Sequence, residues 1–286
     1  MGIRQFVINK SFGLSNRLLE KVSPGKARLW CALRSAKNYN MVEEENEKFF
    51  VKIYMHHIKE RIRKIFGEDR ISILDAGCGQ GRISVPLAME GHDVTGVDVS
   101  SQAIEYAGKY AEGKGVTARF SICDIDKGLE TLVSNTFHCV ISMEVLYMVN
   151  DYQKAIIDMI RLLKHPGILI ISLRPRLYYI LFHLLHNNVE VAKKLAIDDA
   201  VYLQRGFQNC HNADEITGLL TRNGLKDVEL KGIGVLSGIE GDPQGLFAVP
   251  SQLSEKDMET LLRMELKLGD RLVENGRYIL ASAVKI

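Results

Sequence analysis

The stretch Ile71-Ser-Ile-Leu-Asp-Ala-Gly-Cys-Gly-Gln-Gly-Arg-Ile-Ser-Val85 decides the fold that we expect for this chain. It begins with a short apolar run, passes through three closely spaced glycines, and ends in residues that favour a helix from about Arg82 to Met89. Such an apolar run is typical of a strand covered on both faces. Glycines let backbone amides approach a ligand, and the amino end of a helix favours a polar or anionic group. We therefore predict a ligand-binding turn.

The glycine spacing alone leaves several kinds of protein open. A Gly-x-Gly-x-x-Gly dinucleotide fingerprint that starts at Gly77 needs a third glycine at position 82, where the chain has Arg82. One that starts at Gly79 needs it at Ser84, which is a weak match. A nicotinamide-dependent oxidoreductase of Rossmann type is therefore one alternative, and a catalytically silent binding module is another.

Apolar runs alternate with amphipathic segments from residue 71 to residue 173, which is the pattern of βαβ units. Helical spacing of apolar residues also predicts a long helix over 41–66, before the turn. Further strands are expected at 92–98, 118–123, 137–143, 167–173, 226–235 and 277–285. Further helices are expected at 101–112, 150–164, 213–222 and 254–273, with Ser101 as the N-cap of the first of these.

Three segments in this order resemble the motifs of class I S-adenosylmethionine-dependent methyltransferases of the small-molecule type. They are Leu74-Asp-Ala-Gly-Cys-Gly-Gln-Gly81, Met143-Glu-Val-Leu-Tyr-Met-Val149 and Leu162-Leu-Lys-His-Pro-Gly-Ile-Leu-Ile-Ile-Ser172. The resemblance implies an α/β fold with a doubly wound, seven-stranded, mostly parallel sheet in the order 3-2-1-4-5-7-6, the last strand being antiparallel. It also implies S-adenosyl-L-methionine as the cofactor and methyl transfer to an oxygen, nitrogen or carbon of a small molecule.

Cofactor-binding residues are expected in the glycine turn and at the ends of the next strands. Asp98 closes a strand in the crevice of the sheet, where a carboxylate can accept both hydrogen bonds of a ribose diol. In the resembled family an acidic residue in the place of Asp124 binds the adenine amino group, and Ile125 would pack on the base, although Asp126 competes with Asp124. The expected residues are Asp75, Gly77, Cys78, Gly79, Gly81, Asp98, Val99, Asp124, Ile125 and Met143.

Methyl transfer requires alignment of the acceptor, exclusion of water and, for a hydroxyl acceptor, removal of a proton. Candidate bases are Glu144, Tyr147, His183, His186 and His211, although each of these is more often structural. His211 is preferred because it follows an insertion that could return to the sheet as a lid. The sequence shows no metal-ligand constellation, and His56 and His57 are expected to be surface or packing residues because adjacent helical positions point apart.

Length and composition fit one main domain with additions. The chain has 286 residues, of which 46% are hydrophobic and 25% are charged, and its net charge of +2 is too small to indicate a nucleic-acid partner. Five cysteines without a C-x-x-C pair, and no apolar stretch of membrane-spanning length, predict a cytoplasmic protein.

We divide the chain into an N-terminal helical arm and cap (1–66) and a methyltransferase core (67–286) with insertions at 174–210 and 236–275. The apolar segment Leu177–Leu185 covers every direction of a helix, so some of its side chains must contact something other than the sheet. It predicts either a pocket for an apolar or aromatic acceptor, roofed by the arm and the first insertion, or the interface of a homodimer.

Overall fold

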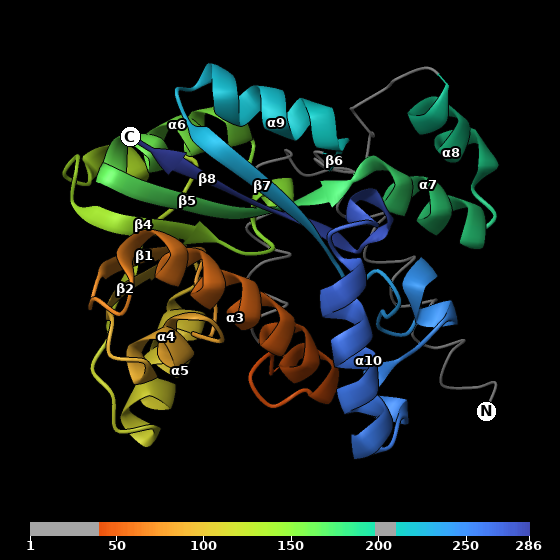
Figure 1. The fold of residues 1–286 in the computed structure, drawn as a ribbon, viewed down its shortest axis with the longest axis horizontal. Helices are drawn as coiled ribbons and strands as arrows, with labels where there is room; N and C mark the ends of the chain where they lie inside the picture. Colours follow the sequence, from red (N-terminus) through yellow and green to blue (C-terminus); the bar gives the residue numbers. More distant parts are fainter. Residues whose placement is uncertain (1–39, 198–209) are drawn as a thin grey trace.

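The computed structural model describes residues 40–197 and 210–286, which fold around a sheet with the strand order β3-β2-β1-β4-β5-β8-β7 (Figure 1). Neighbouring strands are parallel except β8, which runs antiparallel to both β5 and β7. The predicted α/β class, strand order and antiparallel last strand are therefore confirmed. The strands are β1 (Ser72–Ala76), β2 (Asp93–Asp98), β3 (Arg119–Ile122), β4 (Phe137–Ser142), β5 (Leu163–Pro175), β6 (Cys210–His211), β7 (Lys226–Ile233) and β8 (Tyr278–Lys285).

The short strand β6 was not predicted. It lies off the main path of the sheet and pairs with the end of β5, where His211 is opposite Pro175. Two residues are too few to give a period-two pattern in the sequence.

Helices cover both faces of the sheet (Figure 1). They are α3 (Glu45–Phe66), α4 (Ser84–Met89), α5 (Ser101–Gly113), α6 (Tyr152–Leu162), α7 (Arg176–Leu185), α8 (Val189–Ala196), α9 (Ala213–Arg222) and α10 (Glu255–Leu268). Single 3₁₀ turns lie at η1 (Leu129–Thr131), η2 (Leu146–Met148), η3 (Pro243–Leu246), η4 (Pro250–Gln252) and η5 (Val273–Asn275).

Two hydrophobic clusters hold these layers together, because successive strand residues point to opposite faces. On β1, Leu74 packs in the cluster that contains α6 and α9, whereas Ile73 packs in the cluster that contains α3, α4 and α10. Both side chains are 0% exposed, and each contributes about 1.5–3 kcal/mol by leaving water. The carboxyl ends of the parallel strands are thereby fixed along one edge.

Several elements begin or end at other residues than predicted: α10, for example, ends at Leu268 and not at 273, and β5 already begins at Leu163. Two of the differences have a local cause. Helix α4 begins at Ser84 and not at Arg82, because the turn continues through Arg82 and directs this side chain into the protein. The N-cap of α5 is Ser100, whose hydroxyl accepts a hydrogen bond from the amide of Ala103, and not the neighbouring Ser101.

Strands β7 and β8 pair although a long segment separates them. Ile233 is opposite Tyr278, and α10 lies in the intervening segment beside α3 (Figure 1). Glu265 on α10 fastens this segment, since its buried carboxylate accepts hydrogen bonds from the amides of Val235 and Leu236 and the hydroxyl of Ser237.

Most of the predicted arm and part of the first insertion, residues 1–39 and 198–209, lie outside the described residues. None of the helices in the described ranges combines the length and the apolar character that crossing a membrane requires.

Candidate active site

The glycine turn after β1 is held against β2. The amides of Gly77 and Cys78 both donate to the carbonyl oxygen of Val97, at 2.7 and 2.9 Å. Gly77 has φ +84°, and a Cβ atom there would lie 2.3 Å from a methyl carbon of Val145. Only glycine fits at this position, so the turn and the segment after β4 are in direct contact.

Gly79 and Asp98 form the part of the turn that fits a cofactor. Gly79 has φ +51°, and no atom lies within 4 Å of the place where its Cβ would be. The carboxylate of Asp98 accepts the amides of Gly79 and Ser100, both at 2.9 Å, and burial raises its pKa above the usual range. A carboxylate offers about four lone-pair sites, so Asp98 can still accept a ribose diol. Val99, which lies between Asp98 and Ser100 in the sequence, is half-buried.

Three other predicted residues support the turn from within the protein. Asp75 is 2% exposed, its carboxylate accepts the hydroxyl of Ser84 at 2.6 Å, and burial raises its pKa to about 6. Gly81 packs against α5, where an added Cβ would be 3.2 Å from that of Ala107. Cys78 is buried, and burial raises the pKa of its thiol. Their direct contact with a cofactor stays a prediction.

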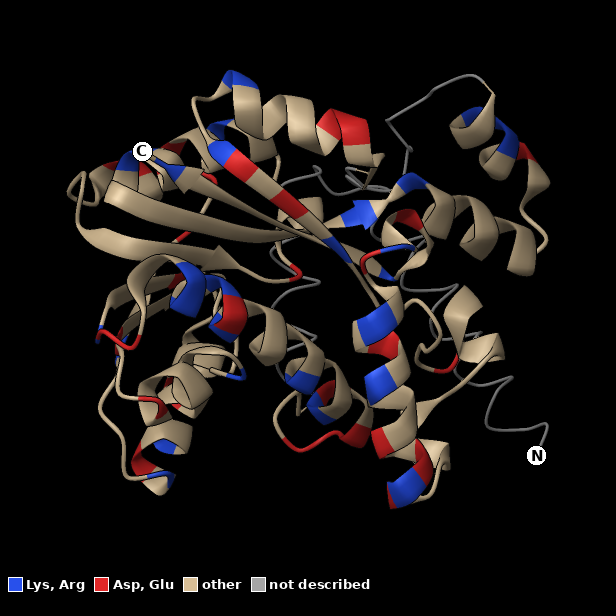
Figure 2. Ribbon diagram, viewed as in Figure 1, with Lys and Arg blue, Asp and Glu red and all other residues tan. Residues whose placement is uncertain are grey.

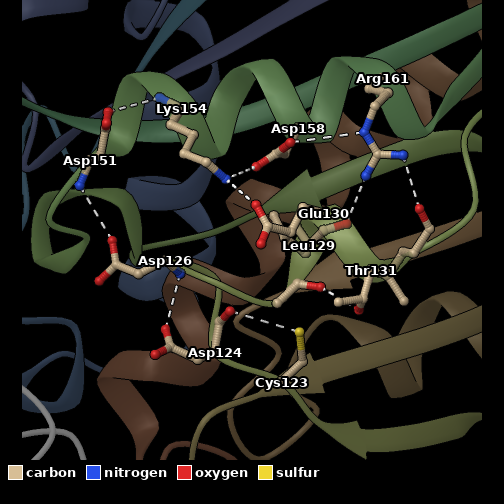
Figure 3. Close-up of polar contacts among 12 residues, drawn as sticks. Cys123, Asp124, Asp126, Leu129, Glu130, Thr131, Asp151, Lys154, Asp158 and Arg161 are labelled. Atoms are coloured by element: carbon tan, nitrogen blue, oxygen red, sulfur yellow. Dashed lines mark hydrogen bonds and ion pairs between the residues drawn. The ribbon is translucent and has the colours of Figure 1, made fainter.

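The loop after β3 separates the roles of the two competing aspartates (Figure 3). Asp126 accepts the amides of Asn150 and Asp151, at 2.8 and 3.3 Å, and so ties this loop to the start of α6. Asp124 is exposed and accepts the amide of Asp126 at 3.0 Å. Ile125 is 7% exposed and packs in the core with Leu129, so its side chain is already engaged. Of the two aspartates, Asp124 is therefore the better placed to bind a ligand.

A buried ion-pair network lies directly beyond the glycine turn. The guanidinium of Arg82 bonds to Glu47 of α3 and, at 3.1 Å, to Glu144, which follows β4. The hydroxyl of Tyr54 donates to Glu144 at 3.1 Å, and the hydroxyl of Ser172 bonds to the Glu144 amide at 2.6 Å. Burial alone would raise the pKa of Glu144, but guanidinium charges, that of Arg82 foremost, lower it below its usual range. These contacts favour a permanently ionised, positioning Glu144.

A second arginine lies in a cage of tyrosine rings at the end of β5. The guanidinium carbon of Arg174 is 5.1 Å from the ring centre of Tyr147 and 4.3, 6.0 and 4.0 Å from those of Tyr178, Tyr179 and Tyr278. Among the described residues no carboxylate is within ion-pair distance of Arg174, and its guanidinium donates a hydrogen bond to the carbonyl oxygen of Arg277 at 3.4 Å. The neighbouring Arg277, in contrast, pairs with Asp242. Arg174 is therefore a cation that aromatic faces stabilise.

The remaining predicted residues differ in their surroundings. Met143 directly follows β4 and is 5% exposed, and Tyr147 contributes a ring to the cage. His211 is 6% exposed, packs on Tyr152 with ring centres 5.0 Å apart, and lies 3.8 Å from Glu215. Burial lowers the pKa of His211 to about 4, so the imidazole is neutral and weakly basic near pH 7. A role for His211 as general base stays a prediction.

Sequence reasoning missed Arg82, Arg174, Arg277 and Tyr278 as site residues. One signal could have found Arg174: it follows a run of apolar residues in a central strand, so it must stand at the carboxyl edge where ligands bind. No comparable spacing relates Arg277 to the turn, because β8 reaches this edge only by pairing with β5.

Comparison with known proteins agrees with this geometry. A model of a methyltransferase domain matches residues 68–224. The ubiquinone biosynthesis O-methyltransferase of Rickettsia canadensis is 32% identical over 190 residues, with 63% of this chain and 74% of that protein covered. The enzyme of the same name from Rickettsia prowazekii is 33% identical over 189 residues, with 63% and 69% covered.

A solved structure shares the fold. The magnesium protoporphyrin IX methyltransferase of Synechocystis PCC 6803, solved with bound SAH, aligns with a TM-score of 0.51 at 18% identity and covers 92% of this chain and 95% of that one. Neither the oxidoreductase nor the silent binding module is favoured by these matches. The chain belongs to the methyltransferase domain family, and it is a class I S-adenosylmethionine-dependent methyltransferase.

Proposed function

We propose that this methyltransferase acts on an oxygen atom of a small aromatic molecule, with a phenol-type hydroxyl as the acceptor. The observation that carries the proposal is the cage of Arg174 and four tyrosine rings at the carboxyl end of β5. Relatives at 32% and 33% identity are O-methyltransferases of ubiquinone biosynthesis, which supports oxygen over nitrogen or carbon.

The position of the cage supports contact between acceptor and cofactor. Val145 touches the glycine turn at Gly77, and Tyr147, two residues further on, contributes a ring to the cage. Tyr278 reaches the same edge because β8 pairs antiparallel with β5, with Ile279 opposite Leu173. Aromatic side chains with a few polar groups are the usual lining of a small-molecule site.

The charge of Arg174 suits the chemistry of a phenol. When bound, S-adenosylmethionine supplies a methyl group on a positively charged sulfur; the carbon–sulfur bond breaks as the carbon–oxygen bond forms, and S-adenosylhomocysteine remains. A phenolate oxygen is a stronger nucleophile than a phenol oxygen, and the guanidinium of Arg174, which has no carboxylate within ion-pair distance in the described ranges, stabilises it electrostatically. Before the methyl group is transferred, the phenol loses its proton to water. This route needs no protein base, which agrees with a pKa of about 4 for His211 and with the pairing of Glu144 with Arg82.

The test is a comparison of acceptors and of variants at Arg174. The purified chain is incubated with S-adenosylmethionine and either a catechol or the corresponding aromatic amine, and methylated products are measured by mass spectrometry. We expect methyl ethers, and we expect Arg174→Met to lower kcat/KM for the catechol by about 100-fold near neutral pH, since one stabilising cation is removed. Arg174→Lys keeps the charge and should lose less.

Affinity for S-adenosylhomocysteine serves as the control for folding and should stay the same in both variants. Preferred methylation of the amine, or full activity of Arg174→Met with the catechol, would show that the acceptor assignment is wrong.

We further infer a cytoplasmic enzyme without a nucleic-acid partner. The scattered cysteines, the net charge of +2 and the mixture of acidic and basic residues on α10 and β7 support this inference (Figure 2). The division into an arm and cap (1–66) and a core (67–286) also stays a proposal.

A homodimer is supported by three leucines on α7 that are 38–45% exposed, Leu181, Leu184 and Leu185. Measurement of mass in solution tests the dimer.

A further inference from the structure

A cavity of about 420 Å³ lies between the second half of α3 and the strands β5, β7 and β8. Its walls include the apolar side chains of Ile170 and Leu280 together with Ser282, and Ile170 is opposite Ser282 in the middle of the sheet. The glycine turn, in contrast, follows the carboxyl end of β1. The cavity is therefore separate from the active site, and it has room for several water molecules of about 30 Å³ each.

The lysines and arginines that line this cavity are already paired with acids, and β7 carries residues of both signs (Figure 2). The acid left over is Glu60, which has no lysine or arginine partner among the described residues. Its carboxylate instead lies 3.3 Å from Nε2 of His56 and 3.9 Å from Nδ1 of His57. The paired groups are Arg61 with Asp227 and Glu229, Arg63 with Glu68, Lys64 with Asp227 and Glu229, and Lys231 with Asp270.

His57 lacks a hydrogen-bond partner in a place where it needs one. The residue is 7% exposed and lines the cavity, and within the described part of the chain neither ring nitrogen has a hydrogen bond. A buried polar group without a partner costs about 1–3 kcal/mol, so a ligand that engages this imidazole would recover stability.

Three metal-ligating side chains meet at this point. One ligand atom each from His56, His57 and Glu60 lie within 4.8 Å of one another. Ligand atoms around a tetrahedral Zn²⁺ at about 2.0–2.2 Å are separated by about 3.3 Å, so shifts of about 1 Å would close the set. The expectation that adjacent histidines point apart overlooked Glu60, which lies three and four residues further along the helix and reaches both of them.

We propose that His56, His57 and Glu60 bind a divalent transition-metal ion such as Zn²⁺, with an open coordination position that faces the cavity. Two imidazole nitrogens and one carboxylate oxygen form a donor set that suits such an ion, and three protein ligands leave one position for water or a small ligand. The site requires nothing from the glycine turn, so it is independent of methyl transfer.

The experiment uses the full chain without an affinity tag, freed of metal by a chelator and titrated with ZnCl₂ in a calorimeter. We expect one equivalent to bind, and Co²⁺ in its place to give a visible absorption band. Glu60→Gln and His56→Asn alter exposed side chains and should each weaken Zn²⁺ binding by about tenfold or more. His165→Asn, which removes an exposed histidine from another part of the chain, is the matched control and should bind as the unaltered protein does.

Affinity for S-adenosylhomocysteine should be equal in all these proteins, which shows that each is folded. The proposal is overturned if the unaltered chain shows no saturable Zn²⁺ binding, or if Glu60→Gln and His56→Asn bind Zn²⁺ as tightly as His165→Asn.

Discussion

Replacing Gly77 with alanine should destabilise the protein through two separable effects. The backbone at this position has φ +84°, a left-handed conformation that costs a residue with a Cβ about 1–2 kcal/mol. The added Cβ would also lie 2.3 Å from a methyl carbon of Val145, and such overpacking costs about 1–3 kcal/mol. We therefore expect Gly77→Ala to lower the free energy of unfolding by about 2–5 kcal/mol, a large share of the stability of a typical domain.

Two further variants separate these effects. Gly79→Ala also places alanine at a positive φ, +51°, but no atom lies within 4 Å of the new Cβ, so the variant shows the backbone cost alone. Val145→Ala removes the methyl groups that obstruct the Cβ at position 77. The double variant Gly77→Ala/Val145→Ala should therefore recover about 1–3 kcal/mol relative to the sum of the single variants.

The assay is urea denaturation followed by circular dichroism, with the free energy of unfolding extrapolated to water. The reasoning is refuted if Gly77→Ala is no less stable than Gly79→Ala, or if Val145→Ala and Gly77→Ala act additively. Calorimetry with S-adenosylhomocysteine adds a second readout, because Gly79→Ala should weaken cofactor binding by filling the space over the turn while Val145→Ala alone should not.

The remaining predictions concern Asp98 and His211. Asp98→Ala should abolish measurable S-adenosylhomocysteine binding, because each lost charge-assisted hydrogen bond costs about 1–3 kcal/mol. It should also lower the free energy of unfolding, since the amides of Gly79 and Ser100 lose their acceptor. An unchanged Kd in calorimetry would disprove the assignment of Asp98 to the ribose. His211 has a pKa of about 4 in the folded protein against 6.5 for the free side chain, so unfolding at a pH between these values takes up a proton. The free energy of unfolding should therefore fall as the pH drops from 6.5 to 4, by at most about 1.4 kcal/mol per pH unit. His211→Gln should remove this part of the slope in urea titrations at pH 7, 6 and 5, and parallel curves for the two proteins would contradict the prediction.

The strands of the sheet could be placed from the hydrophobic pattern, whereas their order and the antiparallel last strand were implied by the resemblance to class I methyltransferases. Every strand of the main path was predicted, and the antiparallel pairing of β8 held although residues 234–277 separate it from β7. Helix α9 (Ala213–Arg222) was predicted to the residue, since Asn223-Gly224 mark its end. The structure adds a capping box of Asn212 and Glu215 that fixes its start.

The candidate site was only partly predictable. Gly77, Gly79 and Asp98 belong to one βαβ unit, so their spacing in the sequence carries their geometry. Arg174 and Tyr278 meet through the pairing of β5 with β8, and no local pattern records such a meeting. Long-range contacts of this kind depend on packing, which sequence spacing does not encode.

The ion pairs of Arg82 make α3 a partner of the cofactor turn in thermodynamic terms. Glu47 lies on α3, and Arg82 follows the last glycine of the turn directly, so undocking the helix would remove one of the carboxylates that pair with this guanidinium. Docking of α3 and ordering of the turn are then linked equilibria, and the coupling is reciprocal: a ligand that orders the turn tightens the helix by the same factor by which the docked helix tightens the ligand. By this reasoning, a helix that precedes the α/β core in the sequence would act as an internal effector of the site.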